Sequence, residues 1–255
     1  MAITETVKDW RTIVLAFFVL ASFVYVLSLA PIPQDLSYHV FADNRASLGI
    51  TNFFNVMSNA AFLIAGIFGI VVSLGTGAEK PPVSWLTFFI GVFFVSIGSA
   101  IYHVAPDNQT LVLDRLPMTV GFMGLFSALI GDYVSPQLGS RLLIPFVATG
   151  IGAVVYWHYF DDLRLYAWVQ FMPIGASALL LGLFPARYTL SAYLLYALLC
   201  YIVAKLFEMN DVLIYRLTDQ VVSGHTLKHV FAAAGCCVLA LMLKFRKPKI
   251  EIPAA

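Results

Sequence analysis

Charged residues are scarce in this chain of 255 residues, since Asp, Glu, Lys and Arg together make up only 11% of it while hydrophobic residues make up 60%. A soluble domain carries about a quarter charged residues, so a mean hydropathy of +0.87 excludes a water-soluble globule. The formal net charge of +1 gives no reason to expect a nucleic-acid partner, and no glycine-rich phosphate loop is present. The sequence is that of an integral membrane protein.

Cysteine is almost as scarce, with three residues in the whole chain. Cys200, Cys236 and Cys237 all lie inside apolar runs, and two adjacent cysteines do not have the usual spacing of metal ligands. We therefore expect these three thiols to be packing residues.

Long hydrophobic runs, in contrast, are abundant. A bilayer core about 30 Å thick needs about 20 apolar residues per helix, and eight such runs occur, at roughly 12–31, 53–74, 84–105, 115–134, 142–159, 165–185, 188–208 and 224–244. Because lipid cannot satisfy backbone polar groups, and because the runs show no alternation with period two, they predict helices. The first run is too long for a signal peptide, and Pro31 stands where cleavage would fall. The expected fold is all-α, with eight transmembrane helices.

Basic residues predict the orientation of this bundle. The segment "LKFRKPK" near the C-terminus dominates the distribution of Lys and Arg, so we expect both termini to be cytoplasmic. Acidic residues gather at the other face. Polar chemistry is therefore expected to face the periplasm, the exterior or a lumen.

Histidines from distant runs fall on that same face. The stretch "GSAIYHVAPDNQTLVLDRLPM", residues 98–118, places His103 at the end of the third run, and "GHTLKH" places His225 and His229 at the start of the eighth. Residues four apart share a helix face, so His225 and His229 can direct two imidazoles to one point, where His103 can supply a third. Three imidazoles with one open position are typical of a catalytic zinc site.

Two further polar residues have natural roles beside such a metal. Asp114, expected to open the fourth run, could accept a proton from a metal-activated water, and Ser99 shares a helix face with His103 and could donate to a developing oxyanion. Each also has a simpler explanation: Asp114 could cap its helix, and Ser99 could bond to its own preceding turn. Their shared face favours the metal site.

Other polar residues carry less weight. We expect His39, in a loop, and His158, in an aromatic cluster, not to be ligands. Asp132 is expected to be solvated at the opposite face. Glu208, Asn210 and Asp211 could contact a substrate headgroup, although we favour a hydrated helix end as their explanation.

The order of these motifs resembles that of the alkaline ceramidases. Their signature has Ser-x-x-x-His, a short loop and Asp-x-x-Pro-Met, which residues 98–118 match; "NVMSN" at 55–59 resembles the family's Asn-x-x-Ser-Asn, and "GHTLKH" at 224–229 its closing His-x-x-x-His. The resemblance implies a seven-helix catalytic core at 52–244, from the superfamily of membrane hydrolases that includes adiponectin-receptor-like proteins. Residues 1–51 would add an N-terminal transmembrane helix and a connecting loop, and 245–255 a basic cytoplasmic tail.

What the resemblance implies about chemistry agrees with the reading of the residues. His103, His225 and His229 would bind Zn²⁺, with Asp114 and Ser99 as the catalytic residues. The implied reaction is hydrolysis of the N-acyl amide bond of ceramide or a related sphingolipid, giving a fatty acid and a long-chain base, and the implied partner is a membrane lipid.

The sequence also departs from the family. Members of the family often have a calcium site built from acidic residues and Trp before the first core helix. At that place this chain offers only Asp35, Asp43, Asn44 and Asn52, which makes calcium binding doubtful. Leu227-Lys228 stands where ceramidases tend to carry tryptophans, so we expect a different pocket wall. Hydrolysis of another lipid amide or ester, and a receptor-like role, stay open. A transporter or haem protein is a further alternative, although neither midplane charges nor internal repeats are seen.

Overall fold

The computed structural model describes residues 9–75 and 81–249, and within these ranges it is a helical bundle without β-strands. Eight helices are long and apolar enough to cross a membrane, which confirms the all-α membrane fold. The spans are α2 (Trp10–Ser28), α3 (Phe53–Ser58) continued by α4 (Ala60–Ser73), α5 (Val83–Val104), α6 (Asn108–Tyr133), α7 (Pro136–Phe160), α8 (Arg164–Leu183), α9 (Ala192–Met209) and α11 (Gly224–Phe245). Two short elements, the 3-10 helix η1 (Leu36–His39) and α10 (Asp211–Leu217), lie outside the spans.

The start of α6 differs most from the expected runs. It begins at Asn108 rather than near residue 115, because Asp107 forms a capping box in which its carboxylate accepts from the backbone N–H of Thr110. The helix starts with Asn, Gln and Thr, and Asp114 and Arg115 follow within two turns, so hydropathy alone does not reveal its start. Asp114 therefore lies within the helix, and the interpretation of Asp114 as a cap is wrong.

The second span is broken at Asn59, where α3 passes into α4. The Asn59 side-chain amide donates to the carbonyl of Asn55 at 2.9 Å and to that of Val56 at 3.3 Å. These bonds satisfy backbone acceptors at the break, as an apolar environment requires.

Helices α5 and α6 approach closely through glycines. A methyl group added at Gly98 would lie 2.0 Å from the carbonyl oxygen of Leu113, and one added at Gly91 would lie 2.6 Å from the backbone nitrogen of Gly121. Small residues let transmembrane helices pack backbone to backbone. This contact brings the segment of α5 around Ser99 against α6.

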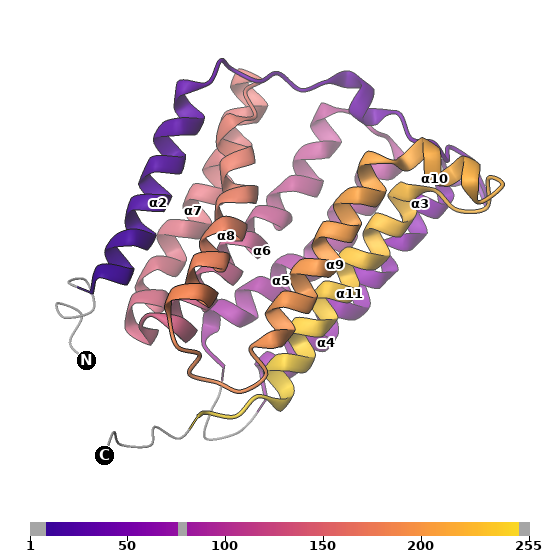
Figure 1. The fold of residues 1–255 in the computed structure, drawn as a ribbon. Coiled ribbons are helices and arrows are strands. Elements are labelled where there is room, and N and C mark those ends of the chain that lie inside the picture. Colours follow the sequence, from indigo (N-terminus) through magenta and orange to yellow (C-terminus); the bar gives the residue numbers. More distant parts are fainter. Residues whose placement is uncertain (1–8, 76–80, 250–255) are drawn as a thin grey trace.

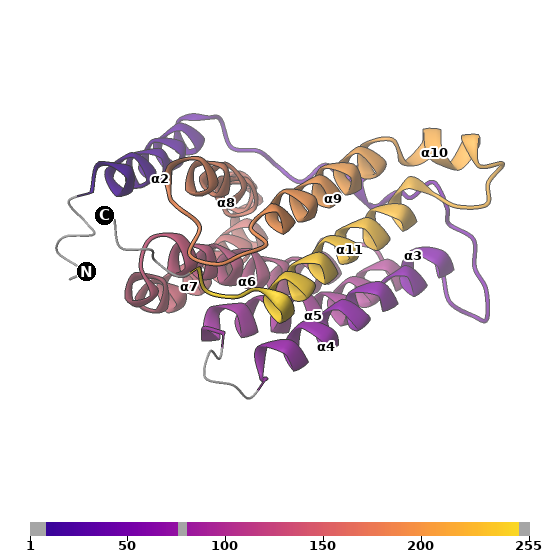
Figure 2. The ribbon, with the colours of Figure 1, turned by 60° about the horizontal axis from the view of Figure 1, so that its bottom comes forward.

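Helix α2 stands at the edge of the bundle beside α8 (Figures 1 and 2). The indole of Trp168 donates to the Ser22 hydroxyl at 3.0 Å, and Arg164 donates to the carbonyls of Leu27 and Leu29. Few α2 side chains are buried. The first span thus packs as a peripheral helix.

The linker 29–52 runs from α2 to α3 across the upper end of the bundle in Figure 1. Its backbone is held at the α7–α8 turn, where the N–H of Gln34 donates to Asp161 and the carbonyl of Ile32 accepts from Leu163. Further along, the N–H of Ala42 donates to Asp211 at the start of α10. The linker thereby covers the end of the bundle at which α5 ends and α11 begins.

The opposite end contains an ion pair that corrects one expectation. Asp132 is not solvated: its side chain is buried, pairs with Arg246 beyond α11 and accepts from the indole N–H of Trp85 at 3.1 Å. Hydropathy does not reveal this partner because Arg246 is more than a hundred residues away in the sequence.

Candidate functional site

Three histidines from two helices meet at the covered end of the bundle. The Nε2 atom of His103 on α5 lies 3.3 Å from the Nε2 atoms of both His225 and His229 on α11. One ligand atom from each residue lies within 4.8 Å of the others, and all three side chains are buried. The structure therefore brings together the three residues expected to be metal ligands.

The spacing of these nitrogens suits zinc. With Zn–N distances of about 2.0–2.1 Å, two nitrogens in a tetrahedral site lie about 3.3–3.4 Å apart. Without a cation, nitrogens that face one another at this distance can form only part of their hydrogen bonds, and His103 Nδ1 is also buried without a partner. The donor set of three buried imidazoles thus fits the metal that the sequence predicts.

The tautomer of His229 is set by its neighbour on α3. The Ser58 hydroxyl donates to the carbonyl of Asn55 at 2.9 Å, so its oxygen is free to accept from His229 Nδ1 at 2.7 Å. A proton on Nδ1 leaves the Nε2 lone pair directed at the other two imidazoles. Such a partner fixes both the tautomer and the orientation of a ligating histidine.

The start of α11 is held by side chains whose roles sequence reasoning missed. Asn55 Oδ1 accepts from the hydroxyl of Thr226 at 2.9 Å, and Asp211 accepts from the backbone N–H of His225 at 2.7 Å. A methyl group at Gly224 would lie 2.2 Å from the carbonyl oxygen of Phe207. The signal for Asn55 and Ser58 was present in "NVMSN", but the motif does not name its partners.

Two phenylalanine rings pack against the histidine cluster. The ring of Phe41, from the linker, lies 4.7 Å from those of both His103 and His225, and Phe62 on α4 lies 5.8 Å from His229. These rings contribute to the burial of the three imidazoles.

Ser99 and Asp114 are buried neighbours across the α5–α6 contact. Both line the same cavity as His229, whose volume is about 550 Å³. The structure therefore places both predicted catalytic side chains on the wall that also carries a candidate metal ligand. Gly98 explains this placement, because a larger residue there would hold α6 away.

The polar end of the cavity is richer in charge than we expected. Glu208 is not a hydrated helix end: it pairs with Lys205 on α9 and with Lys228 on α11, the latter at 2.5 Å, and all three line the cavity. Tyr38, which is exposed, donates to Glu208 at 3.3 Å and adds a further hydrogen bond to this carboxylate.

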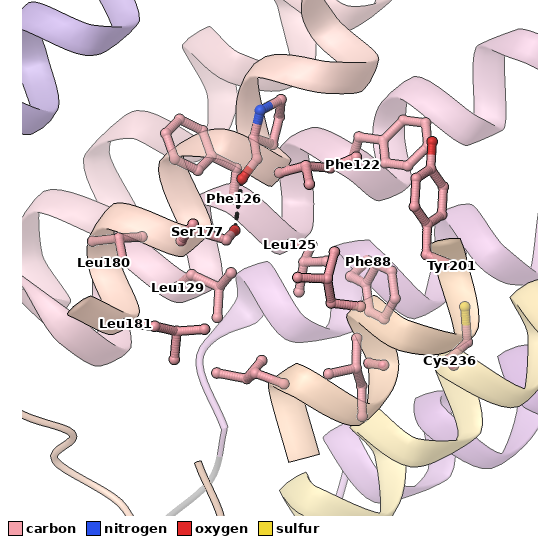
Figure 3. A pocket seen from close by; sticks show the side chains of 18 of the residues that line it. Phe88, Phe122, Leu125, Phe126, Leu129, Ser177, Leu180, Leu181, Tyr201 and Cys236 are labelled. Atoms are coloured by element: carbon pink, nitrogen blue, oxygen red, sulfur yellow. Dashed lines mark hydrogen bonds between the residues drawn. The ribbon is translucent and has the colours of Figure 1, made fainter. Parts of the chain in front are cut away.

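The other wall of the cavity is apolar and leads deeper into the bundle. A second pocket of about 160 Å³ shares Phe88, Phe122, Tyr201 and Cys236 with it, and Figure 3 shows these side chains around that pocket. Its remaining lining is mostly apolar and is rich in Leu from α6, α8 and α9. The two spaces together suit an elongated chain with one polar end.

The residues expected not to bind metal have other surroundings. His39 is hydrogen-bonded to the hydroxyl of Tyr102 and to Asn108, and His158 is exposed on α7. Two of the calcium candidates have structural partners: Asp43 pairs with Arg45 at 2.7 Å, and Asn52 donates to the carbonyl of His103 at 2.8 Å. These two residues anchor the linker and the end of α5.

Fold and site together define a multi-pass membrane protein with a buried trihistidine cluster beside a cavity that has both charged and apolar lining. The family model of the ceramidases matches residues 42–253, and the chain belongs to the ceramidase family. It is also similar to a protein of Dictyostelium discoideum named "Putative alkaline ceramidase dcd3A", with 30% identity over 105 residues. That match covers 36% of this chain and 34% of the relative, so it spans about a third of the relative's length.

Proposed function

We propose that this protein is a zinc-dependent hydrolase that cleaves the N-acyl amide bond of ceramide or a related sphingolipid. The observation that carries the proposal is the cluster of His103, His225 and His229, with nitrogens at the spacing of zinc ligands beside an amphipathic cavity. Membership of the ceramidase family supports the choice of reaction.

The three histidines would hold the metal through Nε2. When bound, zinc supplies Lewis acidity that activates water and polarises a carbonyl. The bond from His229 Nδ1 to Ser58 presents the Nε2 lone pair of this ring, as ligation requires.

Asp114 and Ser99 would carry the proton and charge movements. In the proposed reaction the oxygen of water bonds to the acyl carbon, and Asp114 takes the proton that the water loses. The Ser99 hydroxyl donates a hydrogen bond to the carbonyl oxygen as negative charge develops there. The C–N bond then breaks, and Asp114 returns the proton to the amine, giving a fatty acid and a long-chain base.

The cavity accounts for a lipid substrate. Its apolar wall and the adjoining pocket suit acyl chains, and its polar end, with Asp114, lies at the covered end of the bundle. A lipid could thus keep its chains in apolar surroundings while its amide reaches the histidines. Each Å² of acyl-chain surface that this apolar lining removes from water would stabilise the bound lipid by about 25 cal/mol.

Metal analysis coupled to a hydrolysis assay tests the proposal. Purified wild-type protein should contain about one zinc per chain and cleave short-chain fluorescent ceramide. Alanine at His103, His225 or His229 should abolish zinc retention and turnover together, whereas alanine at the exposed His158 should change neither. A triple-alanine variant of the cluster that still cleaved the substrate would contradict the assignment.

We further propose that both termini are cytoplasmic and that the histidine cluster faces the exterior or a lumen. The basic segment after α11 supports this orientation. On the same grounds, residues 52–244 would form the catalytic core, and residues 1–51 an added helix and linker.

A further inference from the structure

Arg115 is the feature of the cavity that the proposed reaction does not use. It follows Asp114 on α6, is only 5% exposed and lines the cavity. Its Nη2 donates to Gln34 Oε1 at 2.7 Å, but its Nη1 is buried without a hydrogen-bond partner. Among the residues that the structure describes, no carboxylate lies within ion-pair distance of this guanidinium.

The surroundings of Arg115 stabilise its charge without neutralising it. The guanidinium lies 4.1 Å from the ring of Trp157 and 4.5 Å from that of Tyr166, with Tyr38 at 5.7 Å. Aromatic faces attract a cation, but they do not satisfy the N–H donors at the edge of the guanidinium plane. A buried charge with a free donor is costly unless a ligand completes its hydrogen bonds.

The other charges that line the cavity either have partners or are exposed. Glu208 is shared by Lys205 and Lys228, Asp35 is exposed, and the buried Asp114 lies beside Ser99. Among the described residues, Arg115 is thus left as a buried cation of the lining without an anionic partner. Anionic groups are the ligands that arginine binds best, because its planar fork matches carboxylate and phosphate oxygens.

We propose that Arg115 binds an anionic group, a phosphate or a carboxylate, on the headgroup of the lipid amide that the protein hydrolyses. This inference rests on the proposed function and narrows its substrate class from neutral ceramide to amides with an anionic headgroup. The amide lies toward His229 and Ser99, the chains enter the apolar pocket, and the headgroup meets Arg115 and Gln34.

The test compares short-chain ceramide with the same lipid carrying a 1-phosphate, using full-length protein in micelles of neutral detergent. Wild type should cleave the phosphate-bearing lipid with a kcat/KM at least tenfold higher. Arg115→Met should remove this preference, so that the ratio of the two kcat/KM values falls to about one, and Arg115→Lys should keep part of it. Arg141→Met, at an exposed position on α7, should leave both rates unchanged.

The ratio between the two lipids within each variant separates recognition from folding, because a misfolded variant loses both activities. Equal rates for the two lipids in wild type, or a preference that survives in Arg115→Met, would overturn the inference.

Equilibrium binding of both lipids to metal-stripped protein provides a readout without turnover. Tighter binding of the phosphate-bearing lipid that depends on Arg115 supports the inference even if neither lipid is cleaved, in which case the proposed hydrolysis alone fails. Binding of free fatty acid through Arg115, without binding of the phosphate-bearing lipid, would refute it.

Discussion

The hydrogen bond between Ser58 and His229 offers the sharpest test of the metal site, because Ser58 is not itself a candidate ligand. Ser58→Ala removes the oxygen that accepts from His229 Nδ1 at 2.7 Å. The ring then loses the contact that fixes its tautomer and orientation. We expect a weaker metal site with the three imidazoles still present.

The size of the effect follows from burial. His229 is 2% exposed, so its Nδ1–H would be left without a partner, at a cost of about 1–3 kcal/mol. Loss of such a partner typically lowers metal affinity or activity about 10–100-fold, which corresponds to about 1.4–2.8 kcal/mol. A water molecule that replaced the hydroxyl would bring the loss toward the lower end.

Zinc affinity is measured by competition with a chromophoric chelator, and kcat/KM on short-chain ceramide is measured in parallel. Ser96→Ala is the matched control, because the Ser96 hydroxyl also donates to the carbonyl three residues earlier, at 2.6 Å, but touches no histidine. It should leave zinc affinity unchanged, and Ser58→Thr should retain most of it. If Ser58→Ala bound zinc within twofold of wild type, the proposed role of this hydrogen bond would be refuted.

Three other predictions concern packing, pH and orientation. Gly98→Ala should lower the free energy of unfolding by about 1–3 kcal/mol, because its methyl group would meet the Leu113 carbonyl. Gly152→Ala, with open space around the added methyl group, should raise it by about 0.4–1 kcal/mol. Equal melting temperatures of the two variants in detergent would contradict this prediction. Hydrogen bonds from Arg164 lower the pKa of Asp162 to about 2. This carboxylate therefore stabilises the fold above its unfolded pKa of about 3.9, and that stability is lost as pH falls from about 4 toward 2. Asp162→Asn should lower the melting temperature at pH 7 and flatten the decline of the melting temperature below pH 4, and an unchanged decline would argue against the assignment. A green fluorescent protein fused to the C-terminus should fluoresce, and alkaline phosphatase fused there should be inactive in a bacterial host; the reverse pattern would overturn the proposed orientation.

Most of the spans could be predicted because membrane insertion depends on local composition. Runs of about 20 apolar residues identify helices without knowledge of their neighbours, and the number of crossings between His103 and His225 places both at one end of the bundle. Helix α6 was the largest error, because Asp107 and Thr110 start it in a polar segment. A capping box is a local signal, and it could have been read from "DNQT".

Other features of the site depend on contacts between distant segments. The sequence contained Ser58, Asn55 and Glu208, but their partners His229, Thr226 and Lys228 lie on another helix. The buried pair of Asp132 and Arg246 is of the same kind, and so is the aromatic enclosure of Arg115. Hydrogen bonds and ion pairs act over a few ångströms, so their partners become known only once the helices are packed.

The sequence by itself determined that this chain crosses the membrane in eight helices and that its three histidines lie at one end, because hydrophobic length and the alternation of faces are properties of the chain alone. Only the tertiary structure decided that their nitrogens converge to 3.3 Å and that a charged, amphipathic cavity adjoins them. Those distances depend on how closely α5, α6 and α11 pack, and that packing is set by glycines and polar contacts between helices far apart in the sequence.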